Sequence, residues 1–334
     1  MPRDVLSDLL RSVRLRGAVF YHISCRDEWS AEEPAAREIA EAVMPGAEHV
    51  MEYHMIARGQ GWAAVSGLAP ARLAAGDVVM FPHGDAHVMS SAPGKAPHRL
   101  DADWVFSTRH QPKPMPIAFH HGVIQAGAPT PPGEAETVLI CGFLSCDLRP
   151  FNPLIGSLPR LLHVPAPRVG AWVGGVLEQA VIESRDRGPG GDAVLERLSE
   201  MMFVDAVRRH LEGLPEEATG WLAALRDRVV GRALALLHEQ PARDWTLEEL
   251  GREAGLSRSA LHERFVGLVG ETPMHYLTRW RMQLAAGLLR DSRENVAGIA
   301  LQVGYDSEAA FARAFKRVAG LPPAAWRRRH AGAA

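Results

Sequence analysis

The sequence contains few cysteines and no long apolar run. Its three cysteines are odd in number and too few for a disulfide framework, so a reducing, cytoplasmic location is expected. No apolar stretch approaches the ~20 residues that a transmembrane helix needs, so we expect no membrane partner. The N-terminus carries charges throughout and lacks the apolar centre of a secretory signal. These absences argue against the disulfide-rich secreted and the membrane-spanning classes.

The chain also lacks a large net charge. Its 37 Lys+Arg and 39 Asp+Glu residues leave a net charge of −2, which argues against binding to a polyanion through bulk charge alone. From Arg243 to the C-terminus, 14 basic and 10 acidic residues give a local charge of +4, which leaves −6 for the rest. A basic end on an acidic body predicts a local nucleic-acid footprint.

The same helical pattern occurs twice near the C-terminus. The first copy covers Thr246–Pro273 and the second covers Asn295–Pro323. Phe265 and Phe315 end corresponding helices at an offset of 50 residues. Each copy has a short apolar helix, a turn containing glycine, and a second helix that begins at serine. This is the pattern of a helix-turn-helix, which places its second helix in the DNA major groove, so the two copies predict sequence-specific binding to double-stranded DNA.

The second helices divide into an apolar face and an exposed face. Leu261 and Phe265 form the apolar face in the first copy, and Phe311 and Phe315 form it in the second. Arginine can read guanine through two hydrogen bonds, while serine caps and helix N-termini favour phosphates. The residues that we expect to contact DNA are Ser257, Arg258, Ser259, His262, Arg264, Ser307, Glu308, Ala309, Arg313, Lys316 and Arg327.

The first half of the chain has a different pattern. From about Gly17 to Asp147, short apolar runs alternate with turns rich in Gly and Pro, which is typical of a barrel or a double-sheet roll. From Asn152 onward the apolar spacing becomes helical. We expect three domains, which are a sensing domain at residues 1–150, a helical connector at 151–235 and a DNA-binding domain at 236–334. The apolar stripe of the connector is either intramolecular core or also a dimer interface.

Residues 236–330 closely resemble the DNA-binding domain of AraC/XylS-type bacterial transcription regulators. The matching pieces are LEELGREAGLSRSALHERF, GETPMHYLTRWRMQLAAGLL and VAGIALQVGYDSEAAFARAFKRVAGLPPAAWRR. The connector phrase MMFVDAVRRHL is similar to the subgroup with a cupin-type N-terminal domain. The resemblance implies a multi-domain α+β protein with a cupin-like β-barrel, a helical connector, and an all-α domain in which one long helix joins two helix-turn-helix motifs.

Two segments of the first half resemble cupin motifs. In the second motif, GDVVMFPHGDAHVMS, glycines and a proline make tight connections and direct His87 inward. The first motif is degraded, and its three positions, which share strand parity, hold Glu52, His54 and Arg58.

These four residues admit three interpretations. His54 and His87, with a carboxylate, can hold Zn²⁺ or Fe²⁺, although a cation at the position of Arg58 would repel a metal. Alternatively, Glu52, His54, Arg58 and His87 line an effector pocket. In the third interpretation they satisfy one another or solvent.

The cysteines raise the question of redox sensing. Cys25 lies three residues after His22 and next to Arg26, so it is the best candidate for a thiol with a lowered pKa. Cys141 is expected in the core, and its strand parity is opposite to that of Cys146, which argues against a disulfide between them. Some cupin-type regulators that resemble this chain respond to oxidants or electrophiles, so Cys25, Cys141 and Cys146 are the redox candidates.

Three functions remain open from the sequence. The leading one is a transcription regulator, not an enzyme, in which a small molecule or oxidant sensed in the cupin domain controls DNA binding by a homodimer. RNA polymerase is then an expected partner, and the resemblance favours activation. The second is a metal-dependent cupin enzyme with an attached DNA-binding domain. The third is an architectural DNA binder that has no ligand and little sequence preference.

Overall fold

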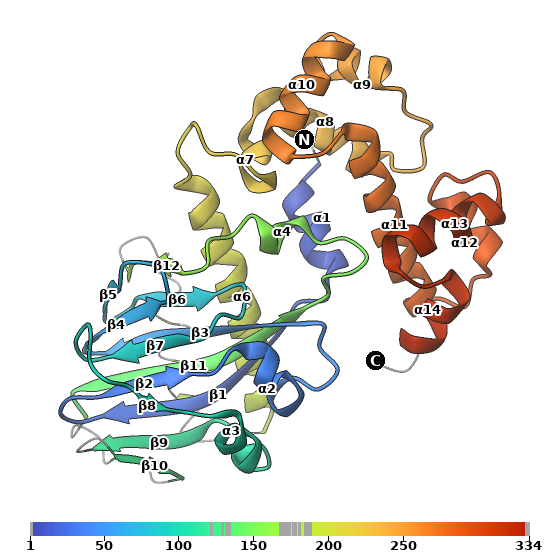
Figure 1. The fold of residues 1–334 in the computed structure, drawn as a ribbon. Coiled ribbons are helices and arrows are strands. Elements are labelled where there is room, and N and C mark those ends of the chain that lie inside the picture. Colours follow the sequence, from blue (N-terminus) through green and yellow to red (C-terminus); the bar gives the residue numbers. More distant parts are fainter. Residues whose placement is uncertain are drawn as a thin grey trace. The chain divides into compact units, whose positions relative to one another are not determined.

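The computed structural model describes residues 3–120, 123–127, 130, 135–166, 175, 179, 182, 183 and 189–330 (Figure 1). The chain divides into two compact units. Residues 15–146 and 158–213 form the β unit, and residues 1–14, 147–157 and 214–334 form the helical unit. Within the described ranges, no helix is both long enough and apolar enough to cross a membrane.

The β unit contains two sheets. The larger sheet has the order β10-β9-β1-β11-β3-β6-β12, with β1 (Arg16–Cys25), β3 (His49–Arg58), β6 (Val78–Phe81), β9 (Met115–His120), β10 (Val123–Ala126), β11 (Thr137–Cys146) and β12 (Leu162–Val164). The smaller sheet has the order β5-β4-β7-β2-β8, with β2 (Ser30–Glu33), β4 (Gln60–Val65), β5 (Ala71–Ala74), β7 (His87–Ser90) and β8 (His98–Arg99).

The expected cupin-like β-rich fold is confirmed, but the expectation of a closed barrel is wrong. A barrel requires hydrogen bonding that continues around the whole circumference. Among the described residues, the two sheets keep separate edges, formed by short strands of two to four residues. One apolar core fills the space between the sheets and includes Phe20 and Phe143 from the larger sheet and Ala63 and Met89 from the smaller one. The architecture is therefore a double-sheet roll.

Among the described residues, three helices complete the β unit, namely α2 (Ala36–Val43), α3 (Ala102–Thr108) and α6 (Gly191–Glu212). The longest, α6, packs against β1, where a Cβ atom on Gly17 would lie 2.5 Å from the Cβ of Ser199. The hydroxyl of Tyr53, on β3, lies 2.6 Å from the Ser199 hydroxyl. Residues 174–188, which belong to the expected helical connector, lie mostly outside the described residues.

The helical unit contains α1 (Val5–Ser12), α4 (Pro153–Gly156), α7 (Trp221–Arg226), α8 (Arg228–Glu239), α9 (Leu247–Ala254), α10 (Arg258–Val269), α11 (Pro273–Asp291), α12 (Val296–Gln302), α13 (Glu308–Ala319) and α14 (Pro323–His330). The expected helix-turn-helix motifs are confirmed as α9–α10 and α12–α13, and the 19-residue helix α11 connects them along the chain. A capping box begins α9, since Thr246 and Glu249 each bond the other's backbone amide.

Two segments from the first half of the chain also belong to the helical unit. Helix α1 packs against α8 and α11, and Asp8 of α1 lies 3.6 Å from the His238 imidazole of α8. The Gln283 side chain, on α11, donates to the carbonyl of Ser12 at 2.9 Å and accepts from the amide of Phe151 at 3.0 Å. The sequence alone did not indicate this arrangement.

Candidate functional site

The second helix of each helix-turn-helix buries its apolar face as expected. Leu261 and Phe265 in α10 and Phe311 and Phe315 in α13 are each 0% exposed. Serine residues begin both helices, because the Ser257 and Ser307 hydroxyls accept hydrogen bonds from the amides three residues later, at 3.3 and 3.2 Å. The opposite faces of α10 and α13 are left for contact with a partner.

Those exposed faces carry most of the residues that the sequence assigned to DNA. Ser257, Arg258, Ser259 and His262 of the first motif are exposed, as are Ser307, Glu308, Ala309, Arg313 and Lys316 of the second. Within the described part of the chain, Arg258, His262, Arg313 and Lys316 make no ion pair or side-chain hydrogen bond. Their charges and donors are therefore available to phosphates or base edges.

Two of the expected DNA contacts are already engaged inside the helical unit. The Arg264 guanidinium donates to the Asp227 carboxylate at 2.6 and 3.0 Å, and Asp227 in turn caps α8. Arg327 donates to the backbone carbonyls of Leu289, at 3.1 Å, and Glu294. Both arginines thus tie elements of the unit together, which distinguishes them from Arg313 and Arg258.

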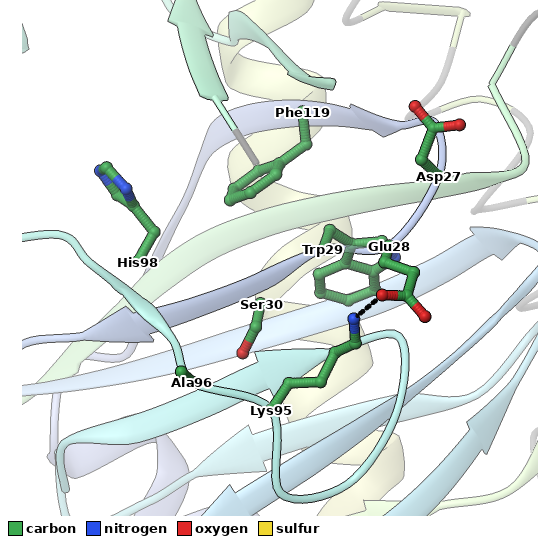
Figure 2. Close-up of a pocket in the computed structure, with 8 residues that line it drawn as sticks. All are labelled: Asp27, Glu28, Trp29, Ser30, Lys95, Ala96, His98 and Phe119. Atoms are coloured by element: carbon green, nitrogen blue, oxygen red, sulfur yellow. Dashed lines mark hydrogen bonds and ion pairs between the residues drawn. The ribbon is translucent and has the colours of Figure 1, made fainter. Parts of the chain in front are cut away.

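An open pocket in the β unit lies beside the start of β2 (Figure 2). Its volume is about 580 Å³, within the range of small-molecule sites. The rings of Trp29 and Phe119 form its apolar walls. Neither residue was expected at a site, although Trp29 directly follows Asp27 and Glu28, and an aromatic residue beside two acids is a visible signal.

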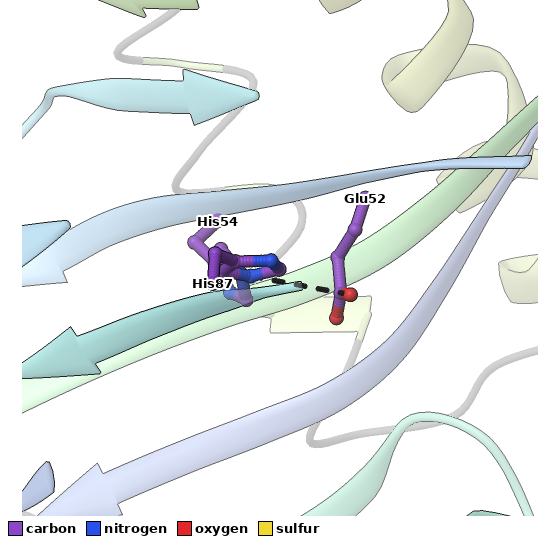
Figure 3. A group of neighbouring side chains, drawn as sticks. All are labelled: Glu52, His54 and His87. Atoms are coloured by element: carbon purple, nitrogen blue, oxygen red, sulfur yellow. Dashed lines mark hydrogen bonds and ion pairs between the residues drawn. The ribbon is translucent and has the colours of Figure 1, made fainter. Parts of the chain in front are cut away.

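The second site of the β unit is a buried cluster of Glu52 and His54 from β3 with His87 from β7 (Figure 3). These residues are 2%, 1% and 2% exposed. The Nε2 atoms of the two imidazoles lie 2.7 Å apart, and Oε2 of Glu52 lies 4.0 Å from Nε2 of His87. The structure therefore brings together three of the four residues assigned to an effector pocket.

Arg58 does not join this cluster, and its expected strand parity is wrong. In the pairing of β3 with β11, Ile56 lies opposite Leu139 and Arg58 lies opposite Val138, so one residue of β3 is extra. This β-bulge reverses the side-chain alternation, and Arg58 is exposed at the end of the strand. Repulsion between a metal ion and the Arg58 cation, which argued against a metal site, therefore does not apply to the cluster.

Burial determines the protonation of the cluster. Desolvation lowers the pKa of His87 to about 4 and lowers the pKa of His54 well below its ordinary value, with a further contribution from His87. Desolvation, followed by the nearby Glu33, raises the pKa of the Glu52 carboxyl well above its ordinary value. Both imidazoles are therefore neutral near pH 7.

With both imidazoles neutral, the hydrogen-bond partners assign the tautomers. His87 Nδ1 lies 3.0 Å from the carbonyl oxygen of Asp85, which can only accept, so Nδ1 donates and Nε2 accepts. His54 Nε2 must then donate to His87, which leaves His54 Nδ1 to accept from the Cys141 thiol at 2.9 Å. The contact of Cys141 with His54 follows from the pairing of β11 with β3, which the sequence alone does not reveal.

The donor set of the cluster fits a divalent metal ion. One atom each from Glu52, His54 and His87 lie within 4.8 Å of one another, and Oε2 of Glu52 is a buried oxygen with no hydrogen-bond partner among the described residues. Two neutral imidazoles and a carboxylate are ligands that Zn²⁺ and Fe²⁺ accept. Coordination through His54 Nε2 requires its proton to move to Nδ1, with Cys141 then accepting instead of donating.

All three cysteines are buried thiols, and none of them forms a disulfide. Burial raises the pKa of the Cys25 thiol, and burial together with nearby acidic groups raises that of Cys141. This is opposite to the lowered pKa expected for Cys25. Its neighbours in the sequence suggested a cationic environment, but the side chain, 1% exposed, lies in the apolar core between the sheets.

Comparisons with known proteins extend these observations. A family model described as "Cupin" matches residues 4–212, and one described as "Helix-turn-helix domain" matches residues 250–329. A "Putative AraC-like transcription regulator" of Streptomyces lividans is 34% identical over 330 residues, which cover 97% of this chain and 98% of that protein. The "HTH-type transcriptional regulator AlkR" of Acinetobacter baylyi is 29% identical over 320 residues, which cover 94% and 95%.

Solved structures also match the C-terminal part. The DNA-binding domain of AdpA, a global transcriptional factor, solved with a target DNA, has 29% sequence identity and a TM-score of 0.30, and the match covers 31% of this chain and 93% of that one. The cupin model spans more than half of this chain, and the Streptomyces relative matches it almost from end to end. The chain therefore belongs to the AraC-like transcription regulators with an N-terminal cupin domain.

Proposed function

We propose that the chain binds its operator through the exposed faces of α10 and α13 and that a small molecule sensed in the β unit changes operator affinity. The observation that carries the proposal is the availability of Arg258 and His262 on one helix and of Arg313 and Lys316 on the other. Control by an effector requires that the effector bind two states of the protein with different affinity. Because we propose DNA as the partner, we expect the protein to act in the cytoplasm.

A binding assay tests the DNA function directly. Duplexes selected from a random pool by the purified chain are compared with scrambled versions of the same composition. A regulator should prefer the selected duplex on the order of 10³-fold or more. Equal affinity for both duplexes would instead support the architectural DNA binder.

We further propose that the regulator is a homodimer and that α6 supplies the contact. Val194 and Met201, seven residues apart on α6, are 38% and 50% exposed. Residues at this spacing lie on one side of a helix, as in a coiled-coil seam. Met201→Glu should shift the sedimentation of the protein to the monomer, whereas Arg37→Glu, at an exposed position of α2, should leave it unchanged. RNA polymerase is the expected further partner, and transcription in vitro from the selected operator distinguishes activation from repression.

A metal is the second component that we propose for the β unit, with Glu52, His54 and His87 as ligands. A bound Zn²⁺ or Fe²⁺ would supply a fixed positive charge among three buried side chains. Elemental analysis of the purified protein should find one metal ion per chain, and His87→Asn should remove it. Wild-type protein without metal after dialysis against Zn²⁺ would contradict this assignment. The tyrosine and tryptophan fluorescence of the variant serves as the control for folding.

A further inference from the structure

The pocket of Figure 2 has the composition of a binding site and takes no part in the cluster around His87. Two aromatic rings, Trp29 and Phe119, line it, and each residue is 4% exposed. Because both rings are fixed in the core, they present rigid faces to whatever enters the pocket. Aromatic faces carry negative partial charge and favour apolar and cationic groups.

A buried hydroxyl in the same pocket lacks a partner. Ser30 is 7% exposed, and its Oγ has no hydrogen-bond partner among the residues that the structure describes. A buried polar atom left unsatisfied destabilises the folded state, so natural proteins rarely retain one without a reason. Ser30 lines the pocket, and a ligand that reaches it would supply the missing hydrogen bond.

The charges around the pocket favour a cation. Asp27 and Glu28 contribute two carboxylates, whereas Lys95 contributes one ammonium group and is paired with Glu28. Asp27 lies 2.9 Å from the His120 imidazole, which carries a charge only when it is protonated. The lining also includes the His98 imidazole. While the imidazoles are neutral, the two carboxylates outnumber the one ammonium group, and an organic anion would meet net repulsion.

The walls of the pocket also form the boundary of a second, deeper space. Trp29 and Phe119 line a narrow cavity of about 20 Å³, which is roughly the room that one water molecule needs. Its other walls are apolar except for Glu33 and His54. The deeper space thus adds one carboxyl group and, among its described lining residues, no lysine or arginine, so it holds no positive charge that would oppose a cation.

We propose that this pocket binds a lipophilic organic cation, an amine or quaternary ammonium compound with an aromatic or alkyl body. The apolar body lies against Trp29 and Phe119, the cationic group faces the carboxylates of Asp27 and Glu28, and Ser30 hydrogen-bonds to the ligand. The inference deepens the proposed function, on which it rests, by naming the chemical class of the effector and a site distinct from the His87 cluster.

Three probes of equal shape test the class of ligand. We would measure binding of 4-phenylbutylamine, 4-phenylbutanol and 4-phenylbutyrate to the full chain by calorimetry and by tryptophan fluorescence. The amine should bind about tenfold more tightly than the alcohol, a difference of about 1.4 kcal/mol, and the carboxylate should bind most weakly. Tightest binding of the carboxylate, or no binding of the amine at about 1 mM, would overturn the proposal.

Variants then assign the site. Asp27→Asn combined with Glu28→Gln should weaken the amine about tenfold and leave the alcohol unchanged, because only the charge is removed from two exposed side chains. The matched control, Glu38→Gln with Glu41→Gln on exposed positions of α2, should change neither. Trp29→Phe should weaken both probes, and the amine more. If the charge variant binds the amine like wild type, the ligand binds elsewhere and the assignment fails.

The same probes separate this inference from the proposed function. If the amine binds at the pocket but leaves affinity for the selected duplex unchanged, the site stands and effector control through it fails. If selected duplexes are bound specifically and none of the probes binds, the DNA function stands and the assigned ligand class fails.

Discussion

Arg264 and Arg313 lie on the second helices of the two motifs, yet their surroundings differ. Arg264 donates two hydrogen bonds to Asp227, a residue that also caps α8 with its side chain. Arg313 is exposed and has no ion-pair partner within the described residues. Equal exposure on a helical wheel therefore does not mean equal availability to DNA.

This difference predicts opposite behaviour of two alanine variants. Arg313→Ala should weaken operator binding by about 1–3 kcal/mol and relax the preference for one base if the side chain reads guanine. Arg264→Ala should have its main effect on the thermal stability of the helical unit, because it removes a contact between α10 and the cap of α8. Titration of selected duplexes at two salt concentrations, with melting curves, separates the two effects. A uniform loss across all duplexes for Arg313→Ala would show a phosphate contact instead.

Glu33 provides a test of the buried electrostatics of the β unit. Burial raises the pKa of its carboxyl from 4.5 to about 7. In the unfolded chain the group ionises near 4.5, so the folded state binds more protons between the two values, and stability falls as the pH rises from about 4.5 to about 7.

Glu33→Gln should remove this dependence. Relative to wild type, the variant should gain stability as the pH rises from about 4.5 to about 7, with little further change above that. Urea denaturation of the β unit at several pH values measures the difference. An exposed carboxylate variant in the same unit, Glu196→Gln on α6, gives the background slope. Parallel curves for Glu33→Gln and wild type would mean that Glu33 is hydrated.

At the scale of elements, α13 shows how one aromatic residue supports a whole motif. Phe315 packs against Phe311, with ring centroids 5.6 Å apart, and against Trp326 of α14 at 5.7 Å. The same cluster includes Ile299 from α12 and Leu289 from α11. Four helices therefore share one small core. Its residues all follow the two helices of the first motif in the sequence.

Phe315→Ala should unfold the second motif selectively. Removing a fully buried phenylalanine typically costs about 3–5 kcal/mol, which a core of this size cannot absorb. Hydrogen exchange should show loss of protection in α12, α13 and α14 while α9 and α10 keep theirs. Phe315→Leu serves as the conservative control and should lose much less. Uniform protection in Phe315→Ala would mean that the motif tolerates the cavity.

The elements that local signals specify were the ones the sequence predicted well. Serine caps, the Thr246 capping box and the positive-φ glycines Gly255 and Gly304 depend on residues a few positions apart, and each helix-turn-helix was predicted correctly. The bulge before Arg58 depends instead on register with β11, which period-two alternation cannot reveal. Likewise, Glu33 lies beside His87 only because β2 pairs with β7. The parts of the site that were missed are the parts built by long-range strand pairing.

At the scale of the whole molecule, the chain passes between its two units four times. It enters the β unit after Arg14 and leaves it after Cys146, and Arg16 and Ser145 pair as neighbours in the larger sheet. Just outside the sheet, the amide of Asp147 donates to the carbonyl of Val13 at 2.7 Å. The two connections therefore leave the β unit as a hydrogen-bonded pair. Residues 1–14 and 147–157 complete a unit formed mainly by residues 214–334. The domain boundaries at residues 150 and 235 that the sequence suggested therefore remain a proposal.

The helical unit should consequently depend on residues that a C-terminal fragment lacks. Leu9 and Val13 are 0% and 1% exposed, and Phe151 is 1% exposed. Removing these segments exposes their apolar contacts and leaves the buried Gln283 amide without its two backbone partners. Each fully buried side chain of this kind contributes about 1.5–3 kcal/mol. A fragment of residues 214–330 should therefore melt well below the helical unit in the full chain.

A point variant in the intact chain tests the same dependence without truncation. Leu9→Ala should destabilise the helical unit by about 2–5 kcal/mol and should speed hydrogen exchange in α8 and α11, against which α1 packs. Leu73→Ala, at a position in β5 that is also 0% exposed, is the matched control and should affect the β unit instead. If the fragment and the full chain protect α8 and α11 equally, and Leu9→Ala leaves both helices unchanged, then α1 contributes nothing to the helical unit. A selective loss in α8 and α11 would mean that the N-terminal helix is part of the DNA-binding half, so that residues at both ends of the sequence determine its stability.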